Sequence, residues 1–239
     1  MQRRTFLGAV GAVVLAACSG DDDDVSAPTT TLRPRSPGTP LTVADFEGAD
    51  TCTLLPEKTA GPFPLDEQLH RSDITEGIAG HHLRLGLRVV DAACAALPGA
   101  AVEVWHADPT GDYSAFADDG GGKDEAEGTT FLRGTQAADP DGIVEFTTVY
   151  PGWYTGRAVH IHLRVHVDDE TVATSQLFFD EAVTERVFSQ EPYAEFGLPD
   201  TSNASDSIAG DPAAEGTLLT LRPADAGTEA LLQISVAAT

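Results

Sequence analysis

The sequence predicts an all-β fold: an antiparallel β-sandwich of about six to nine short strands, with long functional loops and little helix. Apolar and polar residues alternate with period two from residue 80 onward, as in "HHLRLGLRVVD" and "VHIHLRVHV". This alternation is typical of strands with one buried face. Turn sequences such as "LPGA" and "DPDG" separate the alternating runs. The length of 239 residues allows one good-sized domain or at most two small ones.

Residues 1–18 are expected to be an export signal with a lipobox, outside the folded domain. Arg3 and Arg4 precede a short apolar run that ends in Leu-Ala-Ala-Cys, and such an arrangement is typical of a secretory signal. The paired arginines resemble a twin-arginine signal, and the Leu-Ala-Ala-Cys sequence that ends at Cys18 resembles a bacterial lipobox. We therefore expect export and a lipid on Cys18 that holds the protein on the outer side of the cytoplasmic membrane or cell envelope. An ordinary cleaved signal with a chance cysteine is the alternative.

Residues 19–45 are predicted to form a disordered acidic and Pro-rich tether, and residues 46–239 the folded domain. The tether is rich in Asp, Thr, Ser and Pro and has almost nothing to bury. The whole chain carries a formal net charge of −24. This charge repels nucleic acid and anionic lipid headgroups, and it makes a highly anionic substrate a poor candidate.

The expected secondary structure follows from the alternating runs. Strands are predicted at 81–91, 100–108, 128–136, 142–150, 160–168, 172–179, 216–223 and 229–236. Only residues 181–196 have a helical pattern. Residues 111–128 and 198–216 are long, Gly-containing and acidic, and long loops in a compact sandwich are either disordered or functional.

The cysteines predict one disulfide. Besides Cys18, the chain has Cys52 and Cys94, and two cysteines in an oxidising compartment pair by default. A disulfide that closes a loop of about forty residues stabilises the fold by roughly 3–4 kcal/mol. Neither cysteine lies in a CxxC sequence, which argues against a cysteine metal site.

Polar side chains line one face of the strand expected at 160–168. Alternation places His160, His162, Arg164 and His166 on one face and the apolar residues between them on the other. Two histidines at this spacing have a plain interpretation as polar residues on a solvent-facing surface. They are also spaced so that both imidazoles can bind one metal ion without bending the strand.

Two tyrosines favour the metal site. Tyr154 lies in a Pro-Gly turn six residues before His160, and Tyr113 lies in the loop that follows the strand ending "VEVWHAD". Strand-end loops are where sites are usually built on a sandwich. Phenolate is a hard, anionic ligand that favours a trivalent metal. A free Tyr has a pKa near 10, so two phenolates require a strongly charged cation.

These motifs together resemble a known enzyme family. "LPGAAVEVWHADPTGDYS" with "YPGWYTGRAVHIHLRV" is similar to the intradiol ring-cleavage dioxygenases, and most similar to their secreted single-domain members, over residues 52 to about 210. The resemblance implies Fe(III) as the cofactor, held by Tyr113, Tyr154, His160 and His162. It also implies that the chain cleaves a catechol-type ring between the two hydroxyl-bearing carbons with O2, giving a muconate-type diacid.

The resemblance also implies roles for residues around the metal. Arg157 and Gln176 are expected to stabilise charge on the substrate, and Tyr154 to leave the metal and accept a proton. Pro62 and Phe63 are candidate pocket walls. Arg164 is expected at the rim, with substrate contact as the alternative. The expected partners are a small aromatic diol, preferably neutral, and O2, but no nucleic acid.

Two other interpretations fit parts of the sequence. Cupins also carry His-x-His on a strand, but they need a nearby Glu and a later His. This chain has no His after His166. A non-catalytic, cell-surface β-sandwich module that binds a metal or another ligand would explain the fold, the anchor and the acidity. It would not explain Tyr113 and Tyr154 beside the paired histidines.

Overall fold

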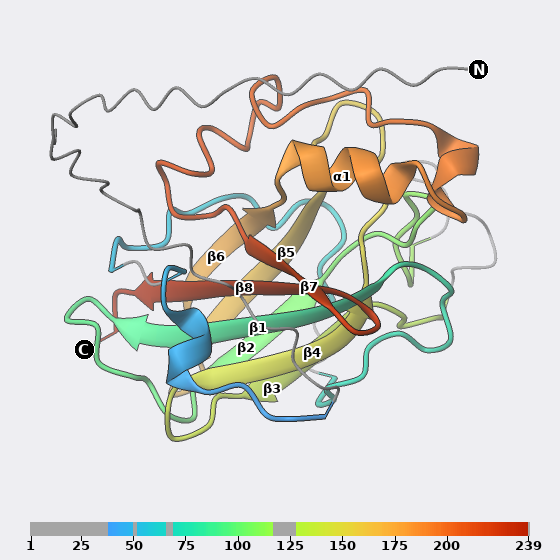
Figure 1. The fold of residues 1–239 in the computed structure, drawn as a ribbon. Coiled ribbons are helices and arrows are strands. Elements are labelled where there is room, and N and C mark those ends of the chain that lie inside the picture. The colour runs from blue at the N-terminus through green and yellow to red at the C-terminus, as the bar shows by residue number, and fades with distance from the viewer. Residues whose placement is uncertain (1–37, 50–51, 66–68, 117–127, 239) are drawn as a thin grey trace, which may run out of the picture. The chain divides into compact units, whose positions relative to one another are not determined.

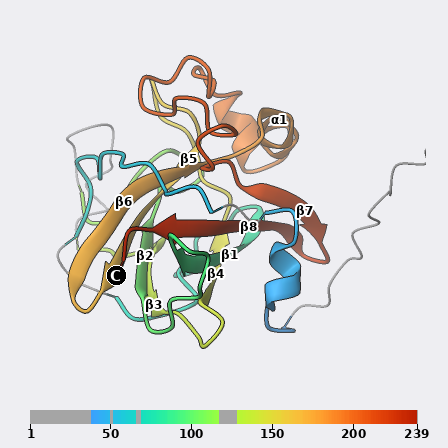
Figure 2. The same ribbon diagram turned by 90° about the vertical axis from the view of Figure 1, so that its left-hand side faces the viewer.

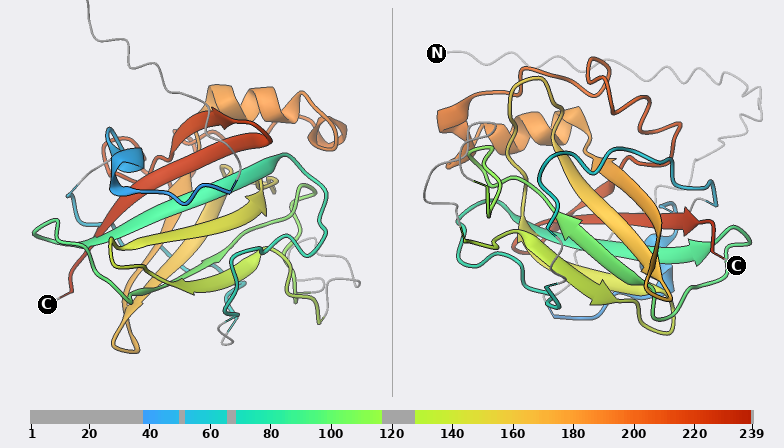
Figure 3. Two further views of the ribbon diagram at one scale, coloured as in Figure 1. Left: turned by 60° about the horizontal axis from the view of Figure 1, so that its bottom comes forward. Right: turned by 180° about the vertical axis from the view of Figure 1, so that it is seen from behind.

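A computed structural model describes residues 38–49, 52–65, 69–116 and 128–238. Its strands form two four-stranded sheets with the orders β4-β1-β8-β7 (sheet A) and β3-β2-β5-β6 (sheet B). The strands are β1 (His82–Asp91), β2 (Ala101–Trp105), β3 (Arg133–Ala137), β4 (Ile143–Val149), β5 (His160–Val167), β6 (Glu170–Phe178), β7 (Thr220–Ala224) and β8 (Gly227–Val236). Sheet A crosses in front of sheet B in Figure 1, and the rear view in Figure 3 brings β5 and β6 forward. The predicted β-sandwich is confirmed.

The core lies between the two sheets. Leu83, Leu85 and Leu87 of β1 face Ile161 and other apolar residues of sheet B, and all four side chains are fully buried. Burying a side chain of this size contributes about 1.5–3 kcal/mol relative to leaving it exposed. Figure 2 shows the two layers from the side. Since the apolar residues of β5 face this core, its histidines lie on the outer face of sheet B.

One strand pair departs from the predicted antiparallel arrangement. β1 and β8 pair in parallel, from Leu83 opposite Thr228 to Asp91 opposite Val236, whereas the other ladders are antiparallel. β8 is inserted between β1 and β7. Alternation along each strand cannot reveal this, because it is the same in parallel and antiparallel pairs.

Several predicted elements are shorter than expected, most clearly one strand and the helix. The strand expected at 128–136 begins only at Arg133, because Leu132 has a φ of 57°, a left-handed conformation that interrupts a strand. The helix expected at 181–196 is α1 (Glu181–Phe188), capped by Asp180, whose side chain accepts the Val183 N–H. The separate 3-10 helix η3 (Tyr193–Phe196) follows Pro192, and proline disfavours a continuous helix.

The packed chain starts a few residues earlier than the predicted boundary at residue 46. Leu41 and Phe46 are buried with Ile143 and Leu231, and Phe46 is the last residue of the 3-10 helix η1 (Val43–Phe46). The end of the expected tether therefore belongs to the fold. The expected signal at 1–18, with Cys18, and the tether up to residue 37 lie outside the described residues. In the described part of the chain, none of the helices has the length and apolar character needed to cross a bilayer.

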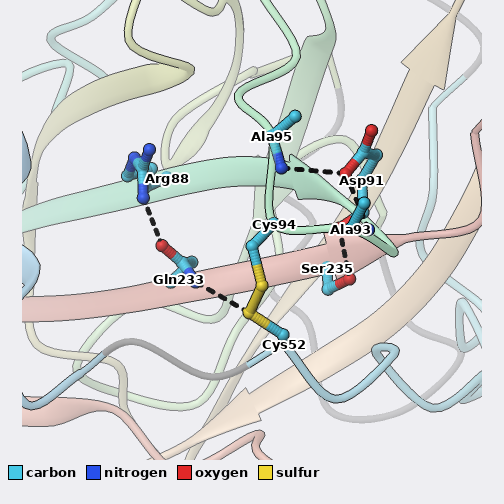
Figure 4. The surroundings of a disulfide bond; sticks show 8 residues. All are labelled: Cys52, Arg88, Asp91, Ala93, Cys94, Ala95, Gln233 and Ser235. Carbon is cyan, nitrogen blue, oxygen red and sulfur yellow. Dashed lines mark hydrogen bonds between the residues drawn. A yellow bond between two sulfur atoms is a disulfide. The ribbon is translucent and has the colours of Figure 1, made fainter.

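A disulfide links Cys52 to Cys94, with the Cα atoms 5.7 Å apart. Figure 4 shows it beside Gln233 of β8. Residues 52–65, which we call the 52–65 segment, run from Cys52 across the sandwich. Leu55 donates its N–H to Ser235 O in sheet A (2.8 Å), and Lys58 donates its N–H to Thr174 O in sheet B (2.9 Å). The disulfide thus anchors a segment that reaches the outer face of sheet B.

Candidate metal centre

Strand register places four polar or aromatic residues in one row across sheet B. Arg133 is opposite Trp105, Trp105 is opposite His162, and His162 is opposite Gln176. Directly opposed residues share a face of the sheet. All four side chains are buried. His160, two residues before His162, lies on the same outer face, and residues from loops therefore cover this part of the sheet.

Two phenols and two imidazoles converge around His162 of this row. His160 Nε2 lies 3.1 Å from His162 Nε2, 3.2 Å from Tyr154 Oη and 3.5 Å from Tyr113 Oη. His162 Nε2 lies 3.2 Å from Tyr113 Oη. The four side chains that the sequence predicts as ligands are thus within contact distance of one another.

Close backbone packing brings the two tyrosine loops together. Gly152 donates its N–H to Asp108 O (3.0 Å), and a Cβ at Gly152 would lie 2.2 Å from that oxygen. On the other loop, a Cβ at Gly111 would lie 2.3 Å from Trp153 O, and Gly111 has a φ of +92°. Only glycine fits these two positions without displacing backbone. The loop after β2, which carries Tyr113, is therefore locked to the turn that carries Tyr154.

Burial controls the protonation of these four groups. It raises the pKa of Tyr113 well above 10, and it raises the pKa of Tyr154 while nearby Arg157 opposes the rise. Burial lowers the pKa of His160 to about 3 and the pKa of His162 well below 6.5. Both imidazoles are therefore neutral near pH 7, and without a cation both phenols keep their protons.

The donor set fits a metal ion. Ala158 O lies 2.6 Å from His160 Nδ1, and because a carbonyl only accepts, that nitrogen carries the proton and Nε2 offers a lone pair. This lone pair points at the three other donor atoms. Metal–ligand bonds of about 2.0–2.2 Å allow one ion to contact four atoms at such separations. Among described residues, no three His, Cys, Asp or Glu side chains form a metal-binding group, so the phenols are essential to this site.

Arg157 and Gln176, predicted next to the metal, lie beside this cluster. Arg157 Nη1 is 3.4 Å from Tyr154 Oη, and Arg157 Nη2 donates to Gln176 Oε1. The Gln176 amide donates in turn to Thr59 O at 2.8 Å. The side chain that contacts Tyr154 is thus connected to β6 and to the 52–65 segment.

The predicted pocket residues differ in their placement. The Phe63 ring stacks on Tyr113 with centroids 4.5 Å apart, so Phe63 covers one face of this candidate ligand. Pro62 is exposed. Arg164 lies two residues after His162 on β5. Its guanidinium lies over the Trp105 ring, and its Nη1 is 3.6 Å from Glu103 Oε2.

Several contributors were not predicted from the sequence. Trp105 stacks on His162 with planes 2° apart and centroids separated by 5.0 Å. Gly61 packs so closely that a Cβ would lie 3.1 Å from His162 Cε1. Arg133, 4% exposed, donates to Ser114 Oγ and Ser114 O beside Tyr113 and to Phe63 O. Only strand register and loop packing reveal these contacts.

His106 does not belong to this cluster, because both of its ring nitrogens have other partners. Its Nε2 lies 2.8 Å from Thr148 Oγ1 and its Nδ1 lies 2.8 Å from Ala107 O. Both ring nitrogens are therefore engaged in hydrogen bonds inside the sandwich.

Comparisons with known proteins agree with this fold. The Dioxygenase family model matches residues 57–190, more than half of the chain. An intradiol ring-cleavage dioxygenase from Tetranychus urticae is 32% identical, with a TM-score of 0.71 over 78% of this chain and 95% of that one. The dioxygenase domain of a carbohydrate-binding fusion protein from Streptomyces sp. SirexAA-E is 26% identical, with a TM-score of 0.57 over 78% and 99%. A chlorocatechol 1,2-dioxygenase from Rhodococcus opacus is 26% identical over 120 residues, 42% of this chain and 44% of that protein.

The sandwich and the family match together define a β-sandwich dioxygenase. More narrowly, the chain belongs to the intradiol ring-cleavage dioxygenase family. The match to the chlorocatechol enzyme spans less than half of that relative.

Proposed function

We propose that this protein is a non-haem Fe(III) intradiol dioxygenase that acts on a neutral catechol. It cleaves the ring between the two hydroxyl-bearing carbons and incorporates both atoms of O2, so that the catechol becomes a muconate-type diacid without an added reductant. The observation that carries the proposal is the convergence of Tyr113, Tyr154, His160 and His162 within 3.1–3.5 Å. Two phenolates and two neutral imidazoles suit a hard trivalent ion.

The two tyrosines have different surroundings, which supports different roles. Tyr113 is only 4% exposed and is covered by Phe63, so it is suited to remain a ligand throughout turnover. Tyr154 is partly exposed and contacts Arg157. It is suited to release the metal and take a proton from the catechol hydroxyl. Ferric iron, when bound, supplies the Lewis acid that draws electron density from the ring.

Arg157 supplies positive charge where negative charge develops on the substrate. Its side chain is 13% exposed and contacts Tyr154 and Gln176. A pre-oriented guanidinium in a largely dry site stabilises an anionic transition state without reorganisation. Gln176, 0% exposed, keeps Arg157 from turning away.

The preference for a neutral catechol rests on how the site's cations are used. Arg157 is paired with Asp206, and the Arg133 guanidinium is directed at Ser114 and Phe63. Neither side chain is left to bind a substrate carboxylate. The net charge of −24 further disfavours an anionic substrate.

The test is oxygen uptake by the iron-loaded protein with catechol, protocatechuate, hydroxyquinol and larger diphenols, with the products analysed as diacids. We expect uptake with a neutral catechol and one diacid formed per O2 consumed. Tyr113→Phe and Tyr154→Phe should lower the rate by at least about a hundredfold. The matched control is Tyr193→Phe, which removes a buried hydroxyl that donates to Tyr150 O outside the site. Equal rates in all three variants would contradict the proposal, as would the absence of ring-cleavage products.

We also propose that the protein leaves the cytoplasm by a twin-arginine route that carries folded proteins, and that Cys18 is lipidated. The support is the sequence of residues 1–18. Replacing Arg3 and Arg4 by Lys should retain metal-loaded precursor in the cytoplasm. Fractionation of cells that express the variant checks this, and unchanged export would contradict the proposed route.

A further inference from the structure

Asp206 is a buried carboxylate in the long loop between η3 and β7. Its side chain is 0% exposed and accepts four hydrogen bonds. Oδ2 accepts from Arg157 Nε (2.9 Å) and Ala158 N (2.7 Å). Oδ1 accepts from Ile208 N (2.7 Å) and Ala209 N (3.1 Å). A carboxylate buried to this extent is stable only because its oxygens are fully engaged.

The Asp206 contact determines which way the Arg157 guanidinium faces. A guanidinium is planar with its N–H groups in a fixed fork, so holding Nε fixes the directions of Nη1 and Nη2. These two nitrogens face Tyr154 Oη and Gln176 Oε1. The same carboxylate oxygen holds Ala158 N, two residues before His160. Asp206 therefore connects the loop to the turn that carries Tyr154 and to the start of β5.

A second ion pair holds the Asp206 turn from the other side. Lys58, whose side chain is 6% exposed, donates to Ile208 O and Ala209 O (3.0 Å each) and to Glu215 Oε2 (2.6 Å). Ile208 and Ala209 are also the residues whose N–H groups bind Asp206. The turn at 206–209 is therefore held between Lys58 and Arg157, and it cannot shift without breaking the hydrogen bonds from Lys58 or the Arg157–Asp206 ion pair.

We propose that Asp206 is a positioning residue for ring cleavage, because it holds the Arg157 guanidinium against the Tyr154 hydroxyl. This inference rests on the proposed function. Asp206 binds Arg157, and Arg157 in turn contacts Tyr154, so Asp206 reaches the donor groups by way of the guanidinium. The long acidic loop then has a specific role, which is to supply the anion that orients the arginine of the site.

The first test is kinetic. Asp206→Asn keeps the volume of the side chain but replaces one acceptor oxygen by an NH2 group, which cannot accept from Arg157 Nε. We expect kcat to fall about 10–100-fold, as for other residues that orient a catalytic group, with little change in KM. In an Arg157→Gln background, Asp206→Asn should lower kcat by less than about twofold, because the residue through which it acts is gone.

The second test does not depend on turnover. In the metal-free full-length protein, the NMR resonance of the Arg157 Nε–H should be sharp and slow to exchange. It should broaden or disappear in Asp206→Asn. The matched control is Glu215→Gln, which alters the ion pair of Lys58 without touching Arg157 or Asp206. This control should retain the resonance and a kcat within about twofold of the wild type.

Two results would overturn the positioning role: an equal loss of kcat with and without Arg157, or an unchanged Arg157 resonance in Asp206→Asn. A wild-type protein that shows the protected resonance but cleaves no catechol would instead contradict the proposed function.

Discussion

At the level of single residues, burial prepares this site for a cation of high charge. The two imidazoles are neutral because burial lowers their pKa values, and the phenols are protonated because burial raises theirs. Ionising both phenols in a site that is largely shielded from water requires a strong positive charge nearby. Arg157 and Arg133 contribute positive charge nearby, and a trivalent ion would supply the remainder.

His106 predicts how stability changes with acid. Burial lowers its pKa from 6.5 to about 4, so the unfolded chain binds the proton more readily. The neutral His106 therefore contributes to the free energy of unfolding above pH 6.5. This contribution, about 3 kcal/mol in total, is lost as the pH falls toward 4. In the metal-free protein, His106→Gln should show a shallower decline of the free energy of unfolding over this window. Denaturant titrations at several pH values measure it, and parallel curves would contradict it.

Gly61 predicts an effect on the metal through His162. Alanine at a φ of +68° costs roughly 1–2 kcal/mol of backbone strain, and its Cβ would also press on the His162 ring. Gly61→Ala should therefore weaken iron binding by about tenfold, roughly 1.4 kcal/mol, in competition with a chelator. Gly77→Ala is the control, because Gly77 has a φ of +83° and nothing within 4 Å of the added Cβ. Equal iron affinity in the two variants would contradict this account of His162.

At the level of elements, the site depends on how strands and loops are joined. Sheet B supplies His160, His162 and Gln176 from adjacent strands, and two loops supply the tyrosines. The 52–65 segment covers the site from a start that is fixed by the Cys52–Cys94 disulfide (Figure 4). The disulfide thus anchors the segment that places Thr59 against Gln176, Gly61 against His162 and Phe63 against Tyr113.

Removing the disulfide should lower the free energy of unfolding but leave oxygen uptake largely intact. Replacing Cys52 and Cys94 by Ser should lower the free energy of unfolding by roughly 3–4 kcal/mol, because the crosslink restricts the unfolded chain over 42 residues. Oxygen uptake at 25 °C should persist, since Leu55 and Lys58 still hold the segment to both sheets. Denaturant unfolding checks the first value. The reduced wild type should unfold at the same denaturant concentration as the variant, and a more stable variant would contradict the account.

The elements also show how much a single sequence reveals. The period-two alternation predicted all eight strands, and the paired histidines and two tyrosines marked the cluster. The parallel pairing of β1 with β8 was not predictable, because it depends on which strands meet. Asp206 was not predictable either, since a carboxylate in an acidic loop has no distinguishing local pattern until the fold places it on Arg157.

At the scale of the whole molecule, three largely buried cations of this acidic protein lie beside the candidate site or the loop that supports it. The net charge is −24, yet Arg133, Arg157 and Lys58 are all largely buried beside the site or its supporting loop. Neutral aromatic diols approach such a protein without electrostatic cost, whereas anionic ones are repelled. The charge distribution therefore agrees with the proposed substrate class.

The proposed iron should stabilise the whole fold when bound, because its four proposed ligands come from two loops and sheet B. A ligand that binds only the folded state at a thousandfold excess over its Kd adds about 4 kcal/mol. Removing iron with a chelator should therefore lower the Tm by several degrees, and adding Fe(III) should restore it. Tyr113→Phe should show a smaller difference. Calorimetry of the loaded and metal-free forms checks this, and identical Tm values would argue against an integral metal centre.

The central claim is that two phenolates and two imidazoles hold one ferric ion, and visible absorption spectroscopy tests it most directly. The iron-loaded protein should be coloured by charge transfer from tyrosinate to Fe(III), and the band should shift when catechol is added without oxygen. The band should weaken in Tyr154→Phe and persist in Tyr193→Phe. A colourless protein that retains zinc, or that takes up no metal, would contradict the account.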